Sequence, residues 1–333
     1  MLKLRDTAVA LSIACFAGVA PAHAAPALTK IAEADLPGPG GLRFDYLRVD
    51  AAGGRLFVTH LSANQIYVVG LNDLRVIGTI KGTPGVEDVA YVPELNRLYT
   101  SNWGENKIGV VDLARMEVVE RIATANKPDG IEYVSAVGKV YVSNERGNVE
   151  SVIDVRTNKT IAEIKFDSET GVPRYDPVAG KLYVNLQDRS VVAVIDPTTD
   201  KITDRIPVPG CSGNHGMALD PEHHRMFLGC EGGSKLAVVD LDKRQVIATF
   251  DLPAGVDFVD YDPGLRRIYA ACGAGAIAIV QQDDPDHYRR LEDLRAESVH
   301  TVVVDPSTHL VYATQEREGG RGIARLVVFE PSR

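Results

Sequence analysis

The chain has 333 residues, and 45 acidic residues against 36 basic ones give it a formal net charge of −9 at pH 7. Binding to nucleic-acid phosphates depends on clustered Lys and Arg, so this composition argues against a nucleic-acid partner. Its hydrophobic share of 45% leaves both enzymes and binding proteins open.

The first 24 residues have the pattern of a secretory signal peptide. Two basic residues precede an apolar run over residues 7–19, and Ala22 and Ala24 occupy the small-residue positions before a cleavage site. The run is too short for a transmembrane helix, which needs about 20 apolar residues. Lipid attachment at Cys15 is the alternative, but Ala22 and Ala24 fit the ordinary cleavage rule better. We expect cleavage after Ala24.

Residues 25–333 are expected to form one domain in an exported compartment, periplasmic or secreted. Cleavage leaves 44 acidic and 34 basic residues, so the mature chain stays strongly acidic. No further segment is apolar enough to cross a membrane, and no Gly/Ser-rich linker separates modules. We therefore predict a single soluble domain with no membrane span.

A six-residue motif recurs along this domain, beginning with RLFVTH at Arg55. Its further copies are RLYTSN from Arg97, KVYVSN from Lys139, KLYVNL from Lys181, RMFLGC from Arg225, RIYAAC from Arg267 and LVYATQ from Leu310. Successive copies start 42, 42, 42, 44, 42 and 43 residues apart. Units of this size cannot bury a core alone, so the steady period indicates repeats that pack on their neighbours.

Each unit contains four short β-branched or aromatic runs bounded by turn residues, which predicts four antiparallel strands. Recurring aspartates such as Asp112 and Asp176 are expected to bond to turn amides. Four strands repeating every ~40–45 residues are typical of a propeller blade. Seven copies predict an all-β, seven-bladed β-propeller with blades starting near residues 44, 86, 128, 170, 214, 256 and 299.

Two units depart from the regular pattern. The last unit lacks a fourth strand, and residues 28–36 read like one, so we expect the N-terminal strand to complete the last blade and close the ring. In the sixth unit, the Asp-Pro-Asp stretch from Asp284 is expected to form a wider turn.

The motifs YVSN at Tyr141 and YVNL at Tyr183, with third strands that close in VVDL or VIDP, resemble the YVTN-type, YncE-like β-propeller proteins. The resemblance covers essentially all of the mature chain. It implies a seven-bladed, exported propeller, but the motif builds blades and specifies no activity. Propellers of this broad group and its relatives include binding proteins, some of which bind DNA, and also lactonases and lyases.

Ten residues before each motif lies the expected start of the innermost strand, and this column is rich in acidic residues and His. It reads Asp45, Glu87, Asp129, Gly171, His215, Asp257 and His300. Innermost strands of a propeller start at one mouth of the axial channel, so these groups should face one another. All but the glycine form a candidate site for a divalent cation or a small polar ligand. The carboxylates favour calcium and the two histidines a transition metal; a hydrated opening without a specific occupant is the alternative.

A second column, at the end of the second strand of each unit, should line the same opening. It reads His60, Asn102, Asn144, Leu186, Cys230, Cys272 and Gln315. Its polar members, His60, Asn102, Asn144 and Gln315, predict a wall that contacts a ligand, although strand ends also favour Asn for turn formation alone. Trp103, the only tryptophan, follows Asn102 and either stacks on a ligand or packs between blades.

Three cysteines remain after cleavage: Cys211, Cys230 and Cys272. In an oxidising compartment we predict a disulfide between Cys211 and Cys230, which would staple the connection into blade five beside the mouth. Cys272 is expected to stay a thiol, because pairing it with Cys230 would join neighbouring blades over a distance beyond the usual reach of a disulfide. No CxxC spacing occurs, so a thiolate zinc site is not expected.

Three functions fit these patterns. The first is an exported binding module that holds a metal ion or a small polar ligand at the channel mouth. The second is a metal-dependent hydrolase or lyase of the lactonase kind, in which the ion polarises a carbonyl and His215 or His300 moves a proton. The third is a protein-interaction platform that uses the rim of the propeller.

Overall fold

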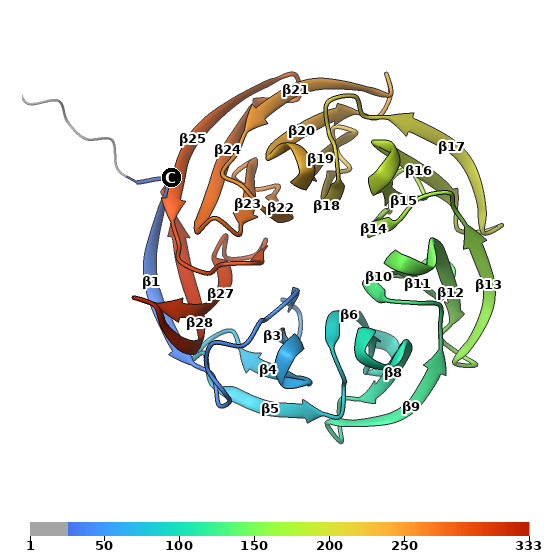
Figure 1. Cartoon of the computed structure of the whole chain (residues 1–333), viewed down its shortest axis with the longest axis vertical. Coiled ribbons are helices and arrows are strands. Elements are labelled where there is room, and N and C mark those ends of the chain that lie inside the picture. The colour runs from blue at the N-terminus through green and yellow to red at the C-terminus, as the bar shows by residue number, and fades with distance from the viewer. Residues whose placement is uncertain (1–25, 333) are drawn as a thin grey trace, which may run out of the picture.

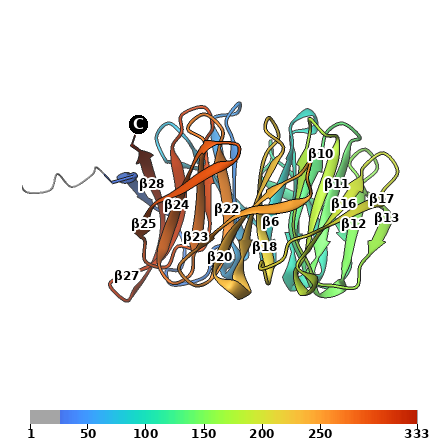
Figure 2. The same ribbon diagram turned by 90° about the horizontal axis from the view of Figure 1, so that it is seen from above.

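Seven four-stranded antiparallel sheets surround a central axis in the computed structural model, which describes residues 26–332 (Figure 1). Seen from the side, the sheets stand next to one another and form a thick disc (Figure 2). The predicted seven-bladed propeller is therefore confirmed. The predicted signal peptide, residues 1–24, lies outside the described residues. Within residues 26–332, no helix has both the length and the apolar composition that a bilayer span requires.

Strand labels follow the sequence, and in each blade the strands succeed one another from the axis outward as follows, for blades 1 to 7 in order. The innermost strands are β2 (Leu47–Asp50), β6 (Val86–Val92), β10 (Pro128–Val134), β14 (Thr170–Asp176), β18 (Asn214–Asp220), β22 (Val256–Asp262) and β26 (Val302–Val304). The second strands are β3 (Arg55–His60), β7 (Arg97–Asn102), β11 (Lys139–Asn144), β15 (Lys181–Leu186), β19 (Arg225–Cys230), β23 (Arg267–Cys272) and β27 (Val311–Glu318). The third strands are β4 (Gln65–Gly70), β8 (Lys107–Asp112), β12 (Val149–Asp154), β16 (Val191–Asp196), β20 (Lys235–Asp240), β24 (Ala276–Asp284) and β28 (Arg321–Pro331). The outermost strands are β5 (Val76–Lys81), β9 (Glu117–Ala123), β13 (Lys159–Lys165), β17 (Lys201–Pro207), β21 (Gln245–Asp251), β25 (His287–Arg295) and β1 (Leu28–Asp35).

The N-terminal strand closes the ring. β1 pairs antiparallel with β28, from Leu28 opposite Pro331 to Asp35 opposite Arg325, and the two strands lie side by side in Figure 1. This pairing covers an edge of β28 that would otherwise offer unpaired N–H and C=O groups to another chain. The predicted closure by the N-terminal strand is confirmed.

Apolar side chains pack between neighbouring blades. Between blades 1 and 2, for example, Phe57, Val68, Val89, Leu98 and Val111 belong to one buried cluster. The inner strands meet a neighbouring blade on both faces, which explains their nearly continuous apolar runs. The outermost strands face solvent and are largely polar, as in β9.

The recurring aspartates hold turns, as predicted. Asp176 Oδ1 accepts hydrogen bonds from the backbone N–H groups of Val178 (2.8 Å) and Ala179 (2.9 Å). Asp112 Oδ1 accepts hydrogen bonds from two backbone N–H groups of its own turn in the same way, at 2.9 and 3.2 Å. The Oδ1 atom of each carboxylate is therefore held by structural bonds.

The turn expected to be wide in blade 6 is a tight one, so that prediction is wrong. β24 and β25 each run for nine residues and are joined by a two-residue turn at Pro285 and Asp286. Asp284 closes this turn, because its Oδ1 accepts hydrogen bonds from the N–H groups of Asp286 and His287, both at 2.9 Å. The extra residues of this blade lengthen its strands.

One acidic side chain lies in an apolar interface. Glu150 is the second residue of β12, a position where β4, β8 and β16 carry Ile or Val, and it is fully buried. Its Oε2 lies 2.8 Å from Ser143 Oγ, which is itself 2.6 Å from Gly171 O of the next blade. A hydroxyl has one hydrogen, so both contacts are satisfied when Glu150 is protonated and donates to Ser143. Burial raises the pKa of Glu150 well above its usual range.

Deletion of residues 28–36 should leave β28 as an exposed edge and open the ring. We expect the shortened chain to aggregate or to lose cooperative thermal unfolding. The matched control is a chain that begins at residue 26, which keeps β1. Size-exclusion chromatography and melting curves measure the difference, and identical curves for the two proteins would contradict the closure.

Replacing Glu150 should change how stability depends on pH. Because the folded-state pKa of Glu150 is raised, the stability it contributes is fully present below the unfolded pKa of about 4.3 and is lost as pH rises through the folded value. Glu150→Gln cannot ionise, so its Tm should exceed that of the wild type at pH 8 and match it more closely at pH 4. A difference of about 1 kcal/mol moves Tm by a few degrees in a chain of this size.

Thermal unfolding from pH 4 to pH 9 measures this effect. The control is Glu163→Gln, which removes an exposed carboxylate from β13 and should leave the pH dependence of Tm unchanged. If both variants follow the wild-type pH dependence, Glu150 is not the group responsible.

Candidate functional site

The mouth of the channel is built from β-bulges near the start of the innermost strands. In β10, Asp129 and Gly130 both lie opposite the single residue Ser143 of β11. Equivalent register shifts occur in β6, β14, β18 and β22. A bulge bends its strand and redirects side chains. It allows the predicted column of acidic and His side chains to meet across the axis.

Side chains of second strands fix these bulges from the preceding blade. Thr59 Oγ1 donates a hydrogen bond to Glu87 O (2.8 Å), and Asn185 Nδ2 donates to His215 O (2.7 Å). Thr59 and Asn185 share the fifth position of the repeated motif. Gly171 completes the close packing, because a Cβ there would lie 3.1 Å from both His215 O and Asn185 Cβ. The mouth residues are thus positioned through their backbones, which leaves their side chains for other contacts.

Asp257 lies between two imidazoles at the mouth. Its Oδ2 is 2.8 Å from His300 Nε2, and its Oδ1 is 3.7 Å from His215 Nε2. Each imidazole also faces a further carboxylate: Asp45 Oδ1 is 3.8 Å from His300 Nε2, and Asp129 Oδ2 is 3.9 Å from His215 Nε2. The structure therefore brings five of the predicted column residues into one continuous chain of contacts.

Arg43, which the sequence column does not include, covers one side of this cluster. Its Nη2 lies 3.2 Å from Asp45 Oδ2 and 2.7 Å from His300 Nε2. The Arg43 side chain is 47% exposed, whereas that of Asp45 is 1% exposed. The guanidinium can consequently move toward solvent without disturbing the core.

Burial and charge set the protonation of the mouth. Burial, reinforced by Glu87, raises the pKa of Asp45 well above its usual range, and burial raises the pKa of Glu87 to about 7. Burial also raises the pKa of Asp129. For Asp257 the effect of burial is outweighed by His300, which lowers the pKa of this carboxyl. For His300 the effect of burial is outweighed by Asp257, which raises the pKa of the imidazole to about 9.

One carboxylate oxygen at the mouth, Asp129 Oδ1, makes no hydrogen bond or ion pair within residues 26–332. Asp45 Oδ2 and Asp257 Oδ2 accept no well-oriented hydrogen bond there, but they lie 3.2 Å from Arg43 Nη2 and 2.8 Å from His300 Nε2. Asp45 and Asp129 are only 1% and 5% exposed, so water does not readily satisfy them. A buried carboxylate oxygen without a donor costs free energy unless a proton or a cation compensates it. These atoms therefore mark a place where a cation would be stabilised.

Two groups of side chains at the mouth have ligand atoms within 4.8 Å of one another, which is close enough to hold a metal ion. They are Asp45, Asp257 and His300, and Asp129, Glu145 and His215. Glu145 belongs to the 3₁₀ turn η4 (Glu145–Gly147) and forms an ion pair with Lys127. Oxygen and imidazole donors together suit zinc or manganese better than calcium. Glu145 and Lys127 stand in connections outside the column, so repeat alignment did not single them out.

Two aromatic side chains lie beneath these groups. Tyr46 and Phe258 directly follow Asp45 and Asp257, are almost fully buried, and have ring centroids 5.1 Å apart. Burial and the nearby carboxylates raise the pKa of Tyr46 well above its usual range, so the phenol keeps its hydrogen. Tyr46 Oη donates this hydrogen to His215 Nε2 at 2.8 Å. His215 Nε2, the atom that a metal ion would bind, therefore directs its lone pair at the phenol, and an ion would have to displace this hydrogen bond.

A second charged layer follows along the innermost strands. Arg48 donates two hydrogen bonds to Asp88, at 3.0 and 2.6 Å, and lies 3.9 Å from Glu132. Glu132 lies 3.8 Å from Arg174, whose guanidinium also packs over the ring of Phe258. Opposite charges alternate here, so this layer is a structural ion-pair network inside the channel. We did not predict it, because three of its residues follow the mouth column by three positions and Asp88 follows it by one, and a regular strand would point side chains at both positions the other way.

The second sequence column lies mainly at buried positions between blades. His60 stacks on Phe44 with ring centroids 3.9 Å apart, and burial lowers the pKa of His60 to about 4. Asn144 Nδ2 donates to Val142 O (3.0 Å), and Asn102 Nδ2 donates to a carboxylate of the following turn at 3.0 Å. Leu186, Cys230 and Cys272 are fully buried as well. These local contacts match the turn-forming interpretation of the column.

Gln315 and Trp103 remain partly exposed. Gln315 lines a pocket of about 200 Å³ between blades 6 and 7, together with Leu294 and Phe329. Trp103 is 37% exposed, and the Lys127 ammonium lies 5.1 Å from its ring centroid. Since Lys127 also pairs with Glu145, Trp103 lies next to the second of the two metal-ligand groups.

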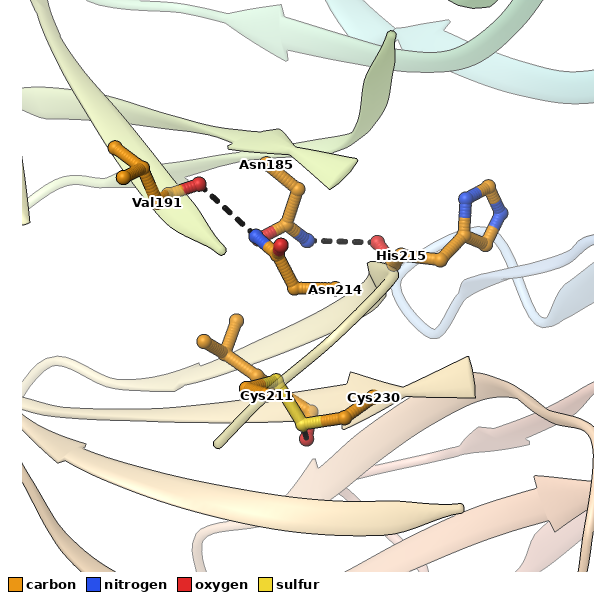
Figure 3. The surroundings of a disulfide bond; sticks show 7 residues. Asn185, Val191, Cys211, Asn214, His215 and Cys230 are labelled. Carbon is orange, nitrogen blue, oxygen red and sulfur yellow. Dashed lines mark hydrogen bonds between the residues drawn. A yellow bond between two sulfur atoms is a disulfide. The ribbon is translucent and has the colours of Figure 1, made fainter. Parts of the chain in front are cut away.

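The predicted disulfide between Cys211 and Cys230 is confirmed and lies beside the mouth (Figure 3). It ties the connection that leads into β18 to the end of β19. At the start of β18, opposite Cys230, Asn214 Nδ2 donates to Asn185 Oδ1 at 2.8 Å, and Asn185 in turn holds His215 O. The disulfide therefore supports the bonds that position His215. Cys272, the one unpaired cysteine of the described residues, is buried, and burial raises its pKa to about 12.

No family model matches this chain, and no curated protein matches it significantly. Solved structures do match. The chain is similar to the hydrazine synthase of Kuenenia stuttgartiensis with 17% identity and a TM-score of 0.74, covering 90% of this chain and 97% of that one. It is similar to U3-55K with 11% identity and a TM-score of 0.75, covering 90% and 98%. It is similar to the WD40 repeats of RRP9 with 12% identity and a TM-score of 0.75, covering 92% and 100%. At these identities the similarity shows the propeller fold alone.

Loss of the disulfide should destabilise the protein. The bridge spans a sequence separation of 19 residues, for which constraint of the unfolded chain contributes about 3 kcal/mol. The double variant Cys211→Ser/Cys230→Ser should melt several degrees below the wild type and should not respond to a reductant. Cys272→Ala is the control, since it keeps the bridge and should respond to the reductant as the wild type does. A wild-type Tm that survives full reduction unchanged would contradict this role.

Proposed function

We propose that this propeller is an exported binding protein that holds a divalent cation at the mouth of its channel. The proposal is carried by the buried Oδ1 of Asp129, which lacks a donor in the described chain, and by the convergence of Asp45 and Asp257 on the same opening. Two imidazole nitrogens lie within 4 Å of these carboxylates. A cation would compensate these carboxylates and use an imidazole as a further ligand. A polar organic ligand with an ammonium group is the alternative occupant of the same site.

Assignment to the YVTN-type, YncE-like proteins and export to an oxidising compartment are parts of this proposal. The repeated motif and the confirmed seven blades support the assignment. The apolar run with small residues before its expected cleavage site supports export, and the disulfide is compatible with it. The acidic mouth speaks against the DNA binding of some relatives.

A metal-dependent hydrolase of the lactonase kind is the second candidate. The observation in its favour is that two imidazoles face one opening and have different partners. His215 contacts the phenol of Tyr46, and His300 contacts the carboxylate of Asp257. An ion would polarise a carbonyl there, and the imidazole that does not bind it would move a proton. A protein-interaction platform at the rim is compatible with the fold.

Cation binding can be tested by calorimetry on chelator-treated protein with zinc, manganese and calcium. We expect binding with a preference for zinc or manganese, because imidazole takes part. Asp45→Asn and His300→Gln each remove one ligand and should weaken binding by roughly tenfold or more, at least as much as the loss of a supporting residue around a metal site.

Asp112→Asn is the matched control for Asp45→Asn. It makes the same chemical change, but Asp112 holds a turn away from the mouth column. It should bind cations as the wild type does. Melting curves of every variant exclude unfolding as the cause of lost binding. Equal affinities in all variants would remove the mouth as the site, and no binding by the wild type would overturn the proposed function.

A further inference from the structure

We propose that the mouth holds two divalent cations bridged by Asp257; this inference rests on the proposed function and adds its stoichiometry. The two oxygens of Asp257 face different imidazoles, Oδ2 at 2.8 Å from His300 Nε2 and Oδ1 at 3.7 Å from His215 Nε2. A carboxylate with a separate nitrogen donor beside each oxygen is placed to bridge two ions. Bridged ions in two-metal sites lie ~3.5–4 Å apart.

Each half of the site has its own terminal carboxylate. Asp45 Oδ1 lies 3.8 Å from His300 Nε2, and Asp129 Oδ2 lies 3.9 Å from His215 Nε2. Ligand bonds of zinc measure ~2.0–2.2 Å, so two atoms on one ion can be at most about 4.4 Å apart. All of these separations fall within that limit. Two ions would therefore fit with side-chain adjustments alone, in the order Asp45, His300, Asp257, His215, Asp129.

The charge of the mouth accommodates two ions when its carboxyl groups are ionised. The four carboxyl groups of Asp45, Glu87, Asp129 and Asp257 converge on it, and three of these residues are at most 5% exposed. With all four ionised, one divalent ion would balance two of the negative charges and two ions would balance all four. Buried charges without compensation are strongly unfavourable. Arg43 balances one of them here, and its exposed side chain can leave when an ion enters.

The contacts of His300 show why protons alone do not satisfy the half of the site formed by Asp45, His300 and Asp257. Its Nε2 lies 2.7 Å from Arg43 Nη2 and 2.8 Å from Asp257 Oδ2. A guanidinium only donates and an ionised carboxylate only accepts. If Nε2 carries a hydrogen, its donor group faces the N–H donor of Arg43. If Nε2 carries none, its lone pair faces the acceptor oxygen of Asp257. An ion between Nε2 and Oδ2 satisfies both atoms once Arg43 turns toward solvent.

The second position has an analogous arrangement. His215 Nε2 accepts its hydrogen bond from Tyr46, so its lone pair is available to an ion that displaces the phenol. A carboxylate oxygen of Glu145 lies within 4.8 Å of ligand atoms of Asp129 and His215. Glu145 also forms an ion pair with Lys127. The buried Oδ1 of Asp129, without a donor in the described chain, belongs to this half. Each half therefore has an imidazole, a terminal carboxylate and one oxygen of Asp257.

The test is manganese binding to the full mature chain after treatment with a chelator. Metal analysis should give two manganese ions per chain, and electron paramagnetic resonance should show the magnetic coupling of a bridged pair. Asp45→Asn and Asp129→Asn should each bind one ion without coupling. Asp257→Asn should lose the coupling, because it removes the bridge. His215→Gln tests the second half independently in case Asp129→Asn does not fold.

One ion per wild-type chain would overturn the two-ion inference and leave the proposed function standing. No ion would overturn both. Two uncoupled ions that persist in Asp257→Asn would place binding elsewhere, for example at the surface pairs His224–Asp242 and His287–Asp284, and would also overturn the inference. Asp112→Asn should keep two coupled ions.

Discussion

Each blade can bury its apolar faces only by packing against two neighbours, so the ring has to close. Seven blades meet this constraint when β1 pairs with β28 and joins the two ends of the chain in one sheet. Closure also brings the starts of all innermost strands to one end of the axis. The chain therefore places six ionisable side chains, Asp45, Glu87, Asp129, His215, Asp257 and His300, around one opening, and the packing that stabilises the fold also creates the charged mouth.

Hydrogen bonds fix the backbone of the mouth, whereas the charges of its side chains are not fully compensated. Bulges opposite the repeated motif fix the backbone positions of the mouth residues, and so do hydrogen bonds such as the one from Asn185 to His215 O. The carboxylates that these residues carry are buried, repel one another, and leave Asp129 Oδ1 without a donor in the described chain. Asp257 joins both imidazoles, while Arg43 supplies the positive charge at one of them. This combination is what a cation site needs: preset ligands with a charge that protons and one guanidinium do not fully balance.

The repeat period was sufficient to predict the blade number, the closing strand and the disulfide, because each depends on spacing along the chain. The column of mouth residues could be read in the same way. Arg43, Tyr46 and Glu145 could not, since they lie outside that column. The ion pairs of Arg48 and Glu132 were missed for a different reason: a bulge adds a residue and reverses which side chains face the channel. A second column, three residues after the first and rich in Arg and acids, is the signal that would have found them. The tight turn at Asp284 depends on side-chain bonds to its own backbone, which strand patterns do not contain.

The most direct test of a cation site at the mouth is a crystal structure of the manganese-soaked protein, with anomalous scattering recorded to locate the metal. We predict anomalous peaks flanking the Asp257 carboxylate, one toward His300 and one toward His215, with Arg43 displaced from Asp45. Manganese found only at surface carboxylates, with Arg43 still in contact with Asp45 and His300, would contradict it.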